Sequence, residues 1–192
     1  MLQRADLWSL EDYSEQRGEF RRRVLAHREN RRVMLGDHIL LTFEDAMTIR
    51  YQIQEMLRVE RIFEAAGIQD ELDAYNPLIP DGDNWKCSLM IQYEDVEERK
   101  RRLTEMVGIE DKIWLRVGDQ PSLFPIADED MSRSNEEKTS AVHFLRYQLN
   151  TEQTDAAKRG APITAGVEHS GYHCQVVTLD EATRSSLVAD LA

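Results

Sequence analysis

The order of apolar periodicities along the 192-residue chain predicts an α+β fold, a single domain spanning residues 1–192. Three observations support this. Segments with helical spacing alternate with short strand-like runs. Two of those runs follow each other closely enough to form a hairpin, which favours a mixed or mostly antiparallel sheet. The length suits one full-sized hydrophobic core, with flanking helices and a long N-terminal helix.

The first half of the chain predicts a helix, a hairpin and two further helices. Ser9 and Asp12 are typical of a helix start, and Tyr13, Phe20 and Val24 recur at helical spacing, so we expect a helix over 9–31. After Gly36 the period changes to two, and the runs 38–44 and 48–53 predict a hairpin with a turn at 45–47. Helices are expected over 54–66 and 68–75, separated by a glycine.

The second half predicts five strands and three helices. Asp95 is typical of a helix start and Gly108 of its end, and a second and third helix are expected over 151–159 and after Asp180. The strands are expected over 85–93, 112–117, 139–149, 163–167 and 173–179. Residues 119–138 are polar and lack a period, which predicts a flexible loop within the domain.

Composition excludes several classes of function. Lysine and arginine number 24 against 36 aspartates and glutamates, a net charge of −12 that opposes binding to nucleic acids and anionic membranes. The longest apolar runs are too short to cross a bilayer, and the N-terminus has no signal-peptide core, so we expect a cytoplasmic protein. Cys87 and Cys174 lie far apart and indicate reduced thiols rather than a disulfide framework or a zinc site.

Glu55 is the most informative polar residue, because it falls on the apolar side of its predicted helix. On a helical projection it lies between Ile62 and Ala66, next to Val59 and Phe63. A carboxylate in such a place needs a partner or a hydrated cavity. If the helix begins near residue 54, Glu55 instead lies in the first turn, where the helix dipole favours it. Both interpretations remain open, and Glu55 is the candidate catalytic residue.

Three histidines are candidate metal ligands. His38, His143 and His169 each lie in or beside a predicted strand, and together with Glu55 they would form a ligand set for a divalent metal such as zinc or iron. The spacing of the dense segment 168–174 matches no standard metal motif, so ordinary hydrogen-bonded histidines explain the pattern equally well. The cofactor therefore stays undefined.

The first helix carries the one basic segment of this acidic chain. Its arginines, interleaved with glutamates, are typical of a solvated face, or alternatively of a surface that docks a protein partner or a second copy of the chain. They are Arg17, Arg21, Arg22, Arg23, Arg28, Arg31 and Arg32.

Several strings together resemble one bacterial protein family of about this length, grouped as a domain of unknown function. They are GDH (36–38), QIQEMLRVERIF (52–63), ELDAYNPLIP (71–80), VGIEDKIWL (107–115), TSAVHFLRYQL (139–149) and the ending with His169 and Tyr172. The family often has a proline after this histidine, where Ser170 stands here. Members are often encoded near rubrerythrin-like and iron-sulfur proteins, so the resemblance implies a redox or stress-related pathway.

These observations favour an accessory or binding protein with a polar pocket near the predicted hairpin and the helix after it. The alternative is a metal-dependent enzyme with a Glu/His site, and a third class is an oligomeric structural protein that associates through residues 9–31. Whether the chain is an enzyme stays open. The candidate ligand-binding residues are Gln52, Glu55, Arg58, Asn76 and Tyr172.

Overall fold

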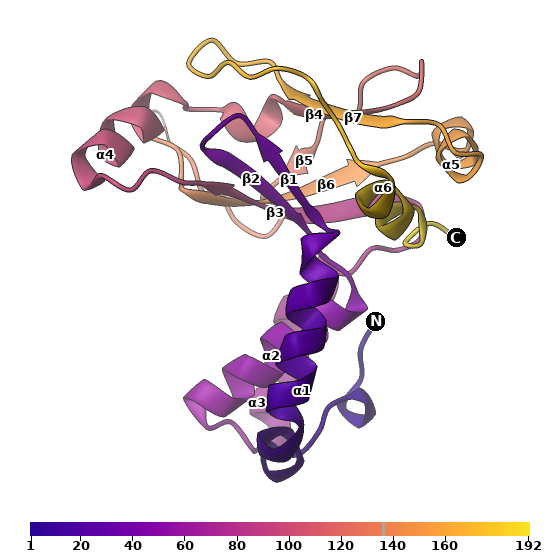
Figure 1. Ribbon diagram of the computed structural model, residues 1–192. Coiled ribbons are helices and arrows are strands. Elements are labelled where there is room, and N and C mark those ends of the chain that lie inside the picture. Colours follow the sequence, from indigo (N-terminus) through magenta and orange to yellow (C-terminus); the bar gives the residue numbers. More distant parts are fainter. Residues whose placement is uncertain (136) are drawn as a thin grey trace.

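The computed structural model describes residues 1–135 and 137–192 and confirms the predicted α+β fold. Helices α1, α2 and α3 form an arm that projects from a body of two β-sheets (Figure 1). The helices are α1 (Leu10–Glu29), α2 (Ala46–Glu60), α3 (Ala65–Tyr75), α4 (Val96–Glu105), α5 (Thr151–Lys158) and α6 (Glu181–Val188). The strands are β1 (Arg32–Leu35), β2 (Ile39–Phe43), β3 (Asn84–Ile91), β4 (Ile113–Val117), β5 (Ile126–Ala127), β6 (Val142–Gln148), β7 (Ile163–Val167) and β8 (Val177–Thr178).

Every strand pair among the described residues is antiparallel. Sheet A has the order β1-β2-β3-β6-β5, and sheet B has the order β4-β7-β8. Because successive side chains of a strand point to opposite faces, the odd-numbered residues of β1, β2, β3 and β6 face sheet B. The even-numbered residues therefore form the outer face of sheet A.

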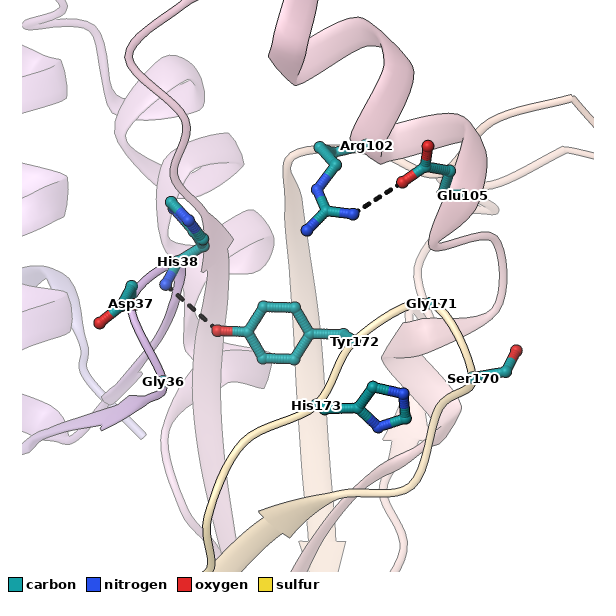
Figure 2. Close-up of a pocket in the computed structure, with 9 residues that line it drawn as sticks. All are labelled: Gly36, Asp37, His38, Arg102, Glu105, Ser170, Gly171, Tyr172 and His173. Carbon is teal, nitrogen blue, oxygen red and sulfur yellow. Dashed lines mark hydrogen bonds and ion pairs between the residues drawn. The ribbon is translucent and has the colours of Figure 1, made fainter.

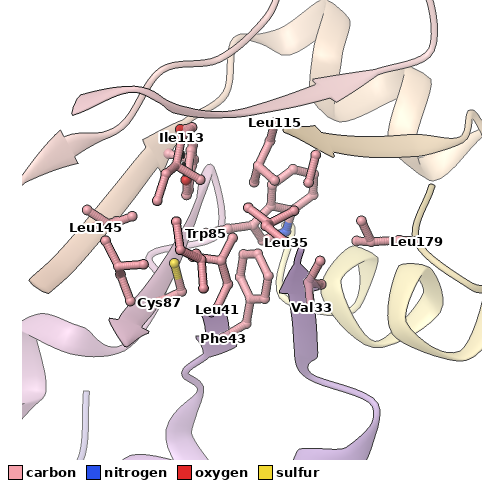
Figure 3. Packing of buried hydrophobic residues seen from close by; sticks show 14 of the residues in the cluster. Val33, Leu35, Leu41, Phe43, Trp85, Cys87, Ile113, Leu115, Leu145 and Leu179 are labelled. Atoms are coloured by element: carbon pink, nitrogen blue, oxygen red, sulfur yellow. Dashed lines mark hydrogen bonds between the residues drawn. The ribbon is translucent and has the colours of Figure 1, made fainter. Parts of the chain in front are cut away.

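The main core lies between the two sheets. Leu41, Phe43 and Trp85 of sheet A meet Ile113 and Leu115 of sheet B, and all five are fully buried (Figure 3). The indole Nε1 of Trp85 donates a hydrogen bond to the Leu187 carbonyl at 2.8 Å, so its single polar atom is satisfied inside the apolar layer. This contact also fixes α6 against the sheets.

The helical arm, which we define as α1, α2 and α3, has a divided interior. One small cluster contains Tyr13, Phe20 and Val24 of α1. A second contains Ile49, Ile53 and Leu57 of α2, spaced four residues apart so that they share one face of the helix. Neither cluster belongs to the core between the sheets.

The predicted hairpin of runs 38–44 and 48–53 is wrong. The real hairpin joins β1 to β2 through the turn at residues 36–38, and residues 46–60 form α2. Asp45 accepts a hydrogen bond from the Thr48 amide, and Thr48 Oγ1 accepts one from the Asp45 amide, a capping pair that starts a helix where a turn was expected. Alternation at residues 49, 51 and 53 also fits a helix with one buried stripe, so the period of two was misleading.

Smaller differences occur elsewhere. The helix expected over 54–66 ends at Glu60, because Arg61 adopts a left-handed conformation with a φ of 57°. The strand expected over 173–179 is reduced to Val177–Thr178. Residues 119–138 include β5 and a bridge between Leu115 and Leu123, while residue 136 lies outside the described residues. The mobility of this loop stays a prediction.

Arg31 joins the arm to the β body. Its fully buried guanidinium donates to the carbonyls of Phe43 and Glu44 at 3.0 and 2.9 Å, and it forms an ion pair with Asp190 after α6. Desolvation of this charge is offset only because so many acceptors surround it. Within the described part of the chain, no helix has both the length and the apolar character required to span a membrane.

Candidate functional site

A polar cavity of about 740 Å³ opens where three segments meet: the β1–β2 turn, the end of α4 and the loop after β7 (Figure 2). Its lining residues come from three distant parts of the chain. They are Gly36, Asp37, His38, Arg102, Glu105, Ser170, Gly171, Tyr172 and His173. We refer to it below as the hairpin cavity.

Two glycines allow these segments to approach each other closely. A Cβ on Gly36 would lie 2.5 Å from the Tyr172 hydroxyl, and the residue has a φ of +66°, which side chains disfavour. A Cβ on Gly171 would collide with the Glu105 carbonyl. The cavity wall therefore requires glycine at both positions.

Tyr172 connects the loop to the hairpin. Its hydroxyl donates to the Leu35 carbonyl at 2.6 Å and accepts from the His38 amide at 3.2 Å. Burial raises the pKa of Tyr172, so the phenol stays protonated and can keep donating. This tyrosine positions the backbone of His38, and its hydroxyl is already engaged by protein atoms.

His38 presents a free ring nitrogen. Its Nδ1 lies 2.9 Å from the Gln92 carbonyl, and since a carbonyl can only accept, Nδ1 carries the proton. The ring stacks on Tyr93 with centroids 3.9 Å apart. Among the described residues, Nε2 has no hydrogen-bond partner, and His38 lines both the hairpin cavity and a neighbouring one of about 930 Å³. Nε2 can therefore accept a hydrogen bond from a ligand.

Arg102 supplies the positive charge of the cavity. Its Nη1 donates to Glu105 at 2.8 Å, and this hydrogen bond is the main cause that raises the pKa of Arg102. Its Nε is buried and has no partner within the described residues. A buried donor without an acceptor is costly, so this nitrogen favours a ligand oxygen.

Glu55 lies in the middle of α2, so its assignment to a first turn is wrong. Its carboxylate accepts from the Tyr13 hydroxyl at 2.6 Å, from Arg17 at 2.7 and 2.9 Å, and from Arg58 at 3.2 Å. The hydrogen bonds from Arg17 are the largest cause that lowers the pKa of Glu55 to about 2. Glu55 therefore has its partners, but these come from α1 and from α2 itself rather than from neighbouring strands.

The apolar side proposed for the Glu55 helix is also wrong at two positions. Val59 and Phe63 are 63% and 67% exposed, because α2 ends before Phe63 and the buried stripe runs through Ile49, Ile53 and Leu57.

The three candidate histidines occupy separate environments. Fully buried His143 bonds to Asp128 through Nδ1 at 2.6 Å and to Thr139 through Nε2 at 2.8 Å. His169 contacts the Val107 carbonyl through Nε2 at 3.0 Å and accepts from the Gly171 amide. In the described ranges, no three side chains of histidine, cysteine, aspartate or glutamate are grouped so as to hold a metal ion. The ligand set of Glu55 with three histidines is not assembled.

The other candidates are dispersed. Gln52 lines a different cavity, and Asn76 bonds to the backbone of Leu2 through both atoms of its amide. Arg58 is occupied by Glu55, and among the candidate ligand-binding residues of the described chain only Tyr172 lines the hairpin cavity. Both cysteines are free thiols.

Arg102 and Glu105 were missed from the sequence. Their helix is dense in charged side chains, and nothing in that pattern marks which arginine turns toward a cavity. The string GDH (36–38) was a usable signal, because its glycine and its histidine both line the cavity.

Fold and site together define an α+β protein with two antiparallel sheets, a helical arm and a polar cavity at a hairpin turn. The chain belongs to the family described as "Protein of unknown function (DUF3501)", which matches residues 1–191. This agrees with the resemblance seen in the sequence.

One solved structure that the chain is similar to is a novel protein of unknown function from Burkholderia pseudomallei K96243. The two are 48% identical, with a TM-score of 0.94, and the similarity covers 100% of this chain and 99% of the other. No curated protein matches the chain.

Proposed function

We propose that this protein is a binding protein whose hairpin cavity holds a small hydroxy acid. The observation that carries the proposal is the pairing of two unsatisfied groups in one cavity: His38 Nε2, an acceptor, and Arg102 Nε, a buried donor. A ligand carboxylate would accept from Arg102, and a ligand hydroxyl would donate to His38.

The surroundings support binding rather than turnover. Tyr172 is committed to the Leu35 carbonyl and Glu105 to Arg102, so neither is free for proton transfer to a ligand. The bound molecule would be held between the hairpin and the loop after β7, segments that Tyr172 already joins. A role in a redox or stress-related pathway, the cytoplasmic location and partner docking through the arginines of α1 stay predictions from the sequence.

Two of the side chains proposed for the metal-dependent alternative already have protein partners. Glu55 is engaged by Tyr13 and Arg17, and His143 is enclosed by Asp128 and Thr139. A catalytic carboxylate with a lowered pKa would be a weak base near neutral pH, which also disfavours that role for Glu55.

The test is a titration of the ¹⁵N-labelled protein with L-malate and, separately, with succinate, which lacks the hydroxyl. We expect malate to shift the amide resonances of Gly36, Gly171 and Tyr172 and to bind about fivefold more tightly than succinate, the effect of one hydrogen bond. His38→Gln should remove this preference.

Arg102→Gln should weaken both ligands. The matched control is Arg101→Gln on the same helix, since Arg101 is not a lining residue, although it pairs with the lining residue Glu105 as well as with Glu98. Malate that leaves the cavity resonances unmoved, or equal losses in the two arginine variants, would refute the proposal.

A further inference from the structure

A second cavity lies between the helical arm and the outer face of sheet A. It measures about 310 Å³, within the range of small-molecule sites. Its floor is a row of three side chains in register across three strands, Thr42, Ser88 and Phe144. Its roof comes from the arm and includes Arg28, Ile49 and Gln52. We call it the elbow cavity.

One buried carboxylate in this cavity has no cation. Glu44 is 8% exposed, and its two oxygens accept from the hydroxyls of Ser88 at 2.8 Å and Thr48 at 2.7 Å. No ion pair to it is found among the described residues. A carboxylate offers about four acceptor positions, so two neutral hydroxyls leave capacity for a further donor. A positively charged donor would offset the cost of burying this charge.

Cations without carboxylates line the same cavity. Within the described chain neither Arg28 nor Arg32 forms an ion pair, and Arg28 Nε is buried without a hydrogen-bond partner. The Thr42 hydroxyl is likewise unpartnered, although Thr42 is only 5% exposed. Native proteins satisfy most such buried atoms, and these two lie in one cavity, where a single ligand could offer hydrogen bonds to both.

An apolar wall completes the cavity. Ile49, Leu78, Tyr75 and Phe144 line it, and the last three also line a neighbouring cavity of about 500 Å³. The basic groups of that neighbour are paired, Lys86 with Asp81 and Arg146 with Glu129. The charged groups without an ion-pair partner are therefore concentrated at the end of the elbow cavity near Arg28. The apolar surface continues from there into the neighbouring cavity.

We infer that the elbow cavity binds a free α-amino acid with an apolar side chain. Its ammonium group would meet Glu44, its carboxylate would meet Arg28 and Arg32, and its side chain would pack on Phe144 and Leu78. A zwitterion is the smallest ligand that supplies both charges, whereas a simple carboxylate would leave Glu44 without a cation. This inference is independent of the hairpin cavity, which shares none of these residues.

The test is isothermal titration of the full chain with three matched ligands: L-phenylalanine, 3-phenylpropanoate, which lacks the amine, and phenethylamine, which lacks the carboxylate. We expect L-phenylalanine to bind at least about tenfold more tightly than either analogue, because each analogue leaves either Glu44 or the two arginines of the cavity without an opposite charge. Equal affinity of the three ligands, or no heat with L-phenylalanine at millimolar concentration, would overturn the inference.

Variants localise the site. Arg28→Gln and Thr42→Val should each weaken L-phenylalanine binding, and Thr42→Val should do so without loss of stability, since it removes a hydroxyl that has no partner. Arg22→Gln is the control, because Arg22 is exposed on α1 and pairs with Glu19. Binding that survives both test variants, or that falls equally in the control, contradicts the assignment.

Discussion

The helical arm and the β body are stabilised in different ways. Between the sheets, one continuous core buries Trp85, Phe43, Leu115 and their neighbours. The arm instead has two small clusters, and its α1–α2 contact also includes the hydrogen bonds of Glu55 with Tyr13 and Arg17. A core stabilises in proportion to the apolar area removed from water, whereas a charge-assisted pair depends on protonation and geometry.

This difference predicts which region of the molecule loses stability first when the pH changes. Acid should weaken the arm before the β body, because the arm has a carboxylate at its centre. Local opening also begins where few apolar contacts hold the chain. The elbow cavity lies between the two regions, so a ligand there would contact both the helical arm, which we expect to be acid-sensitive, and the β body, which we expect to be more stable.

The largest effect on stability is expected at Arg31, which joins the arm to the β body. Arg31→Met should lower the free energy of unfolding by about 3–5 kcal/mol in urea denaturation, because it leaves the largely buried Asp190 without its cation. It also removes one of the two ion-pair partners of Asp45, which keeps His27. Burial already raises the pKa of Asp190, so the added change Asp190→Asn should recover part of the loss. A cost below about 1 kcal/mol would mean that arm and body are joined mainly by other contacts.

A smaller effect is expected at the centre of the arm. Glu55→Gln should cost about 2 kcal/mol near neutral pH. The pKa of Glu55 is lowered from 4.5 to about 2, so its contribution is complete above pH 4.5 and is lost as the pH falls through 2. Urea denaturation of both proteins between pH 2 and 7 should show the difference shrinking over that interval. A difference that does not change with pH would argue against a charged Glu55.

The smallest measurable effect on stability is expected for Tyr13, the uncharged hydrogen-bond partner of Glu55. Tyr13→Phe removes one hydrogen bond to Glu55 and should cost about 1 kcal/mol, since Arg17 continues to hold the carboxylate. Thermal and urea unfolding would measure it against Arg22→Gln, an exposed change on the same helix that should stay within about 0.5 kcal/mol. A Tyr13→Phe cost as large as that of Glu55→Gln would show that the phenol organises the contact.

The sequence predicted those elements whose signals are local. Ser9, Asp95 and Asp180 each cap a helix at the place expected, accepting the amide of a residue three positions later. The strands β3, β4 and β7 were recognisable from their apolar runs. The segment 48–53 was not, because alternating apolar residues fit a strand and a one-sided helix alike, and the capping pair of Asp45 and Thr48 decides between them.

The candidate site was less predictable. His38 was identified only as a histidine in or beside a predicted strand, whereas its place in the cavity depends on Gln92, Tyr93 and Arg102, which are distant in the chain. Whether the candidate metal ligands meet was unpredictable for the same reason. His38, His143 and His169 are similar as isolated residues, and only their neighbours distinguish a buried structural histidine from one with a free nitrogen.

The sequence by itself determined the fold class, the helix caps, the acidic charge and the family, because these depend on composition and on contacts a few residues long. It also marked Glu55 as a carboxylate that either needed a partner or lay in a first helical turn. Only the tertiary structure decided that this partner is Arg17 of α1 and that Gly36 meets Tyr172. Such pairs are separated by tens of residues or more, and their meeting depends on how sheets and helices pack, which no local pattern encodes.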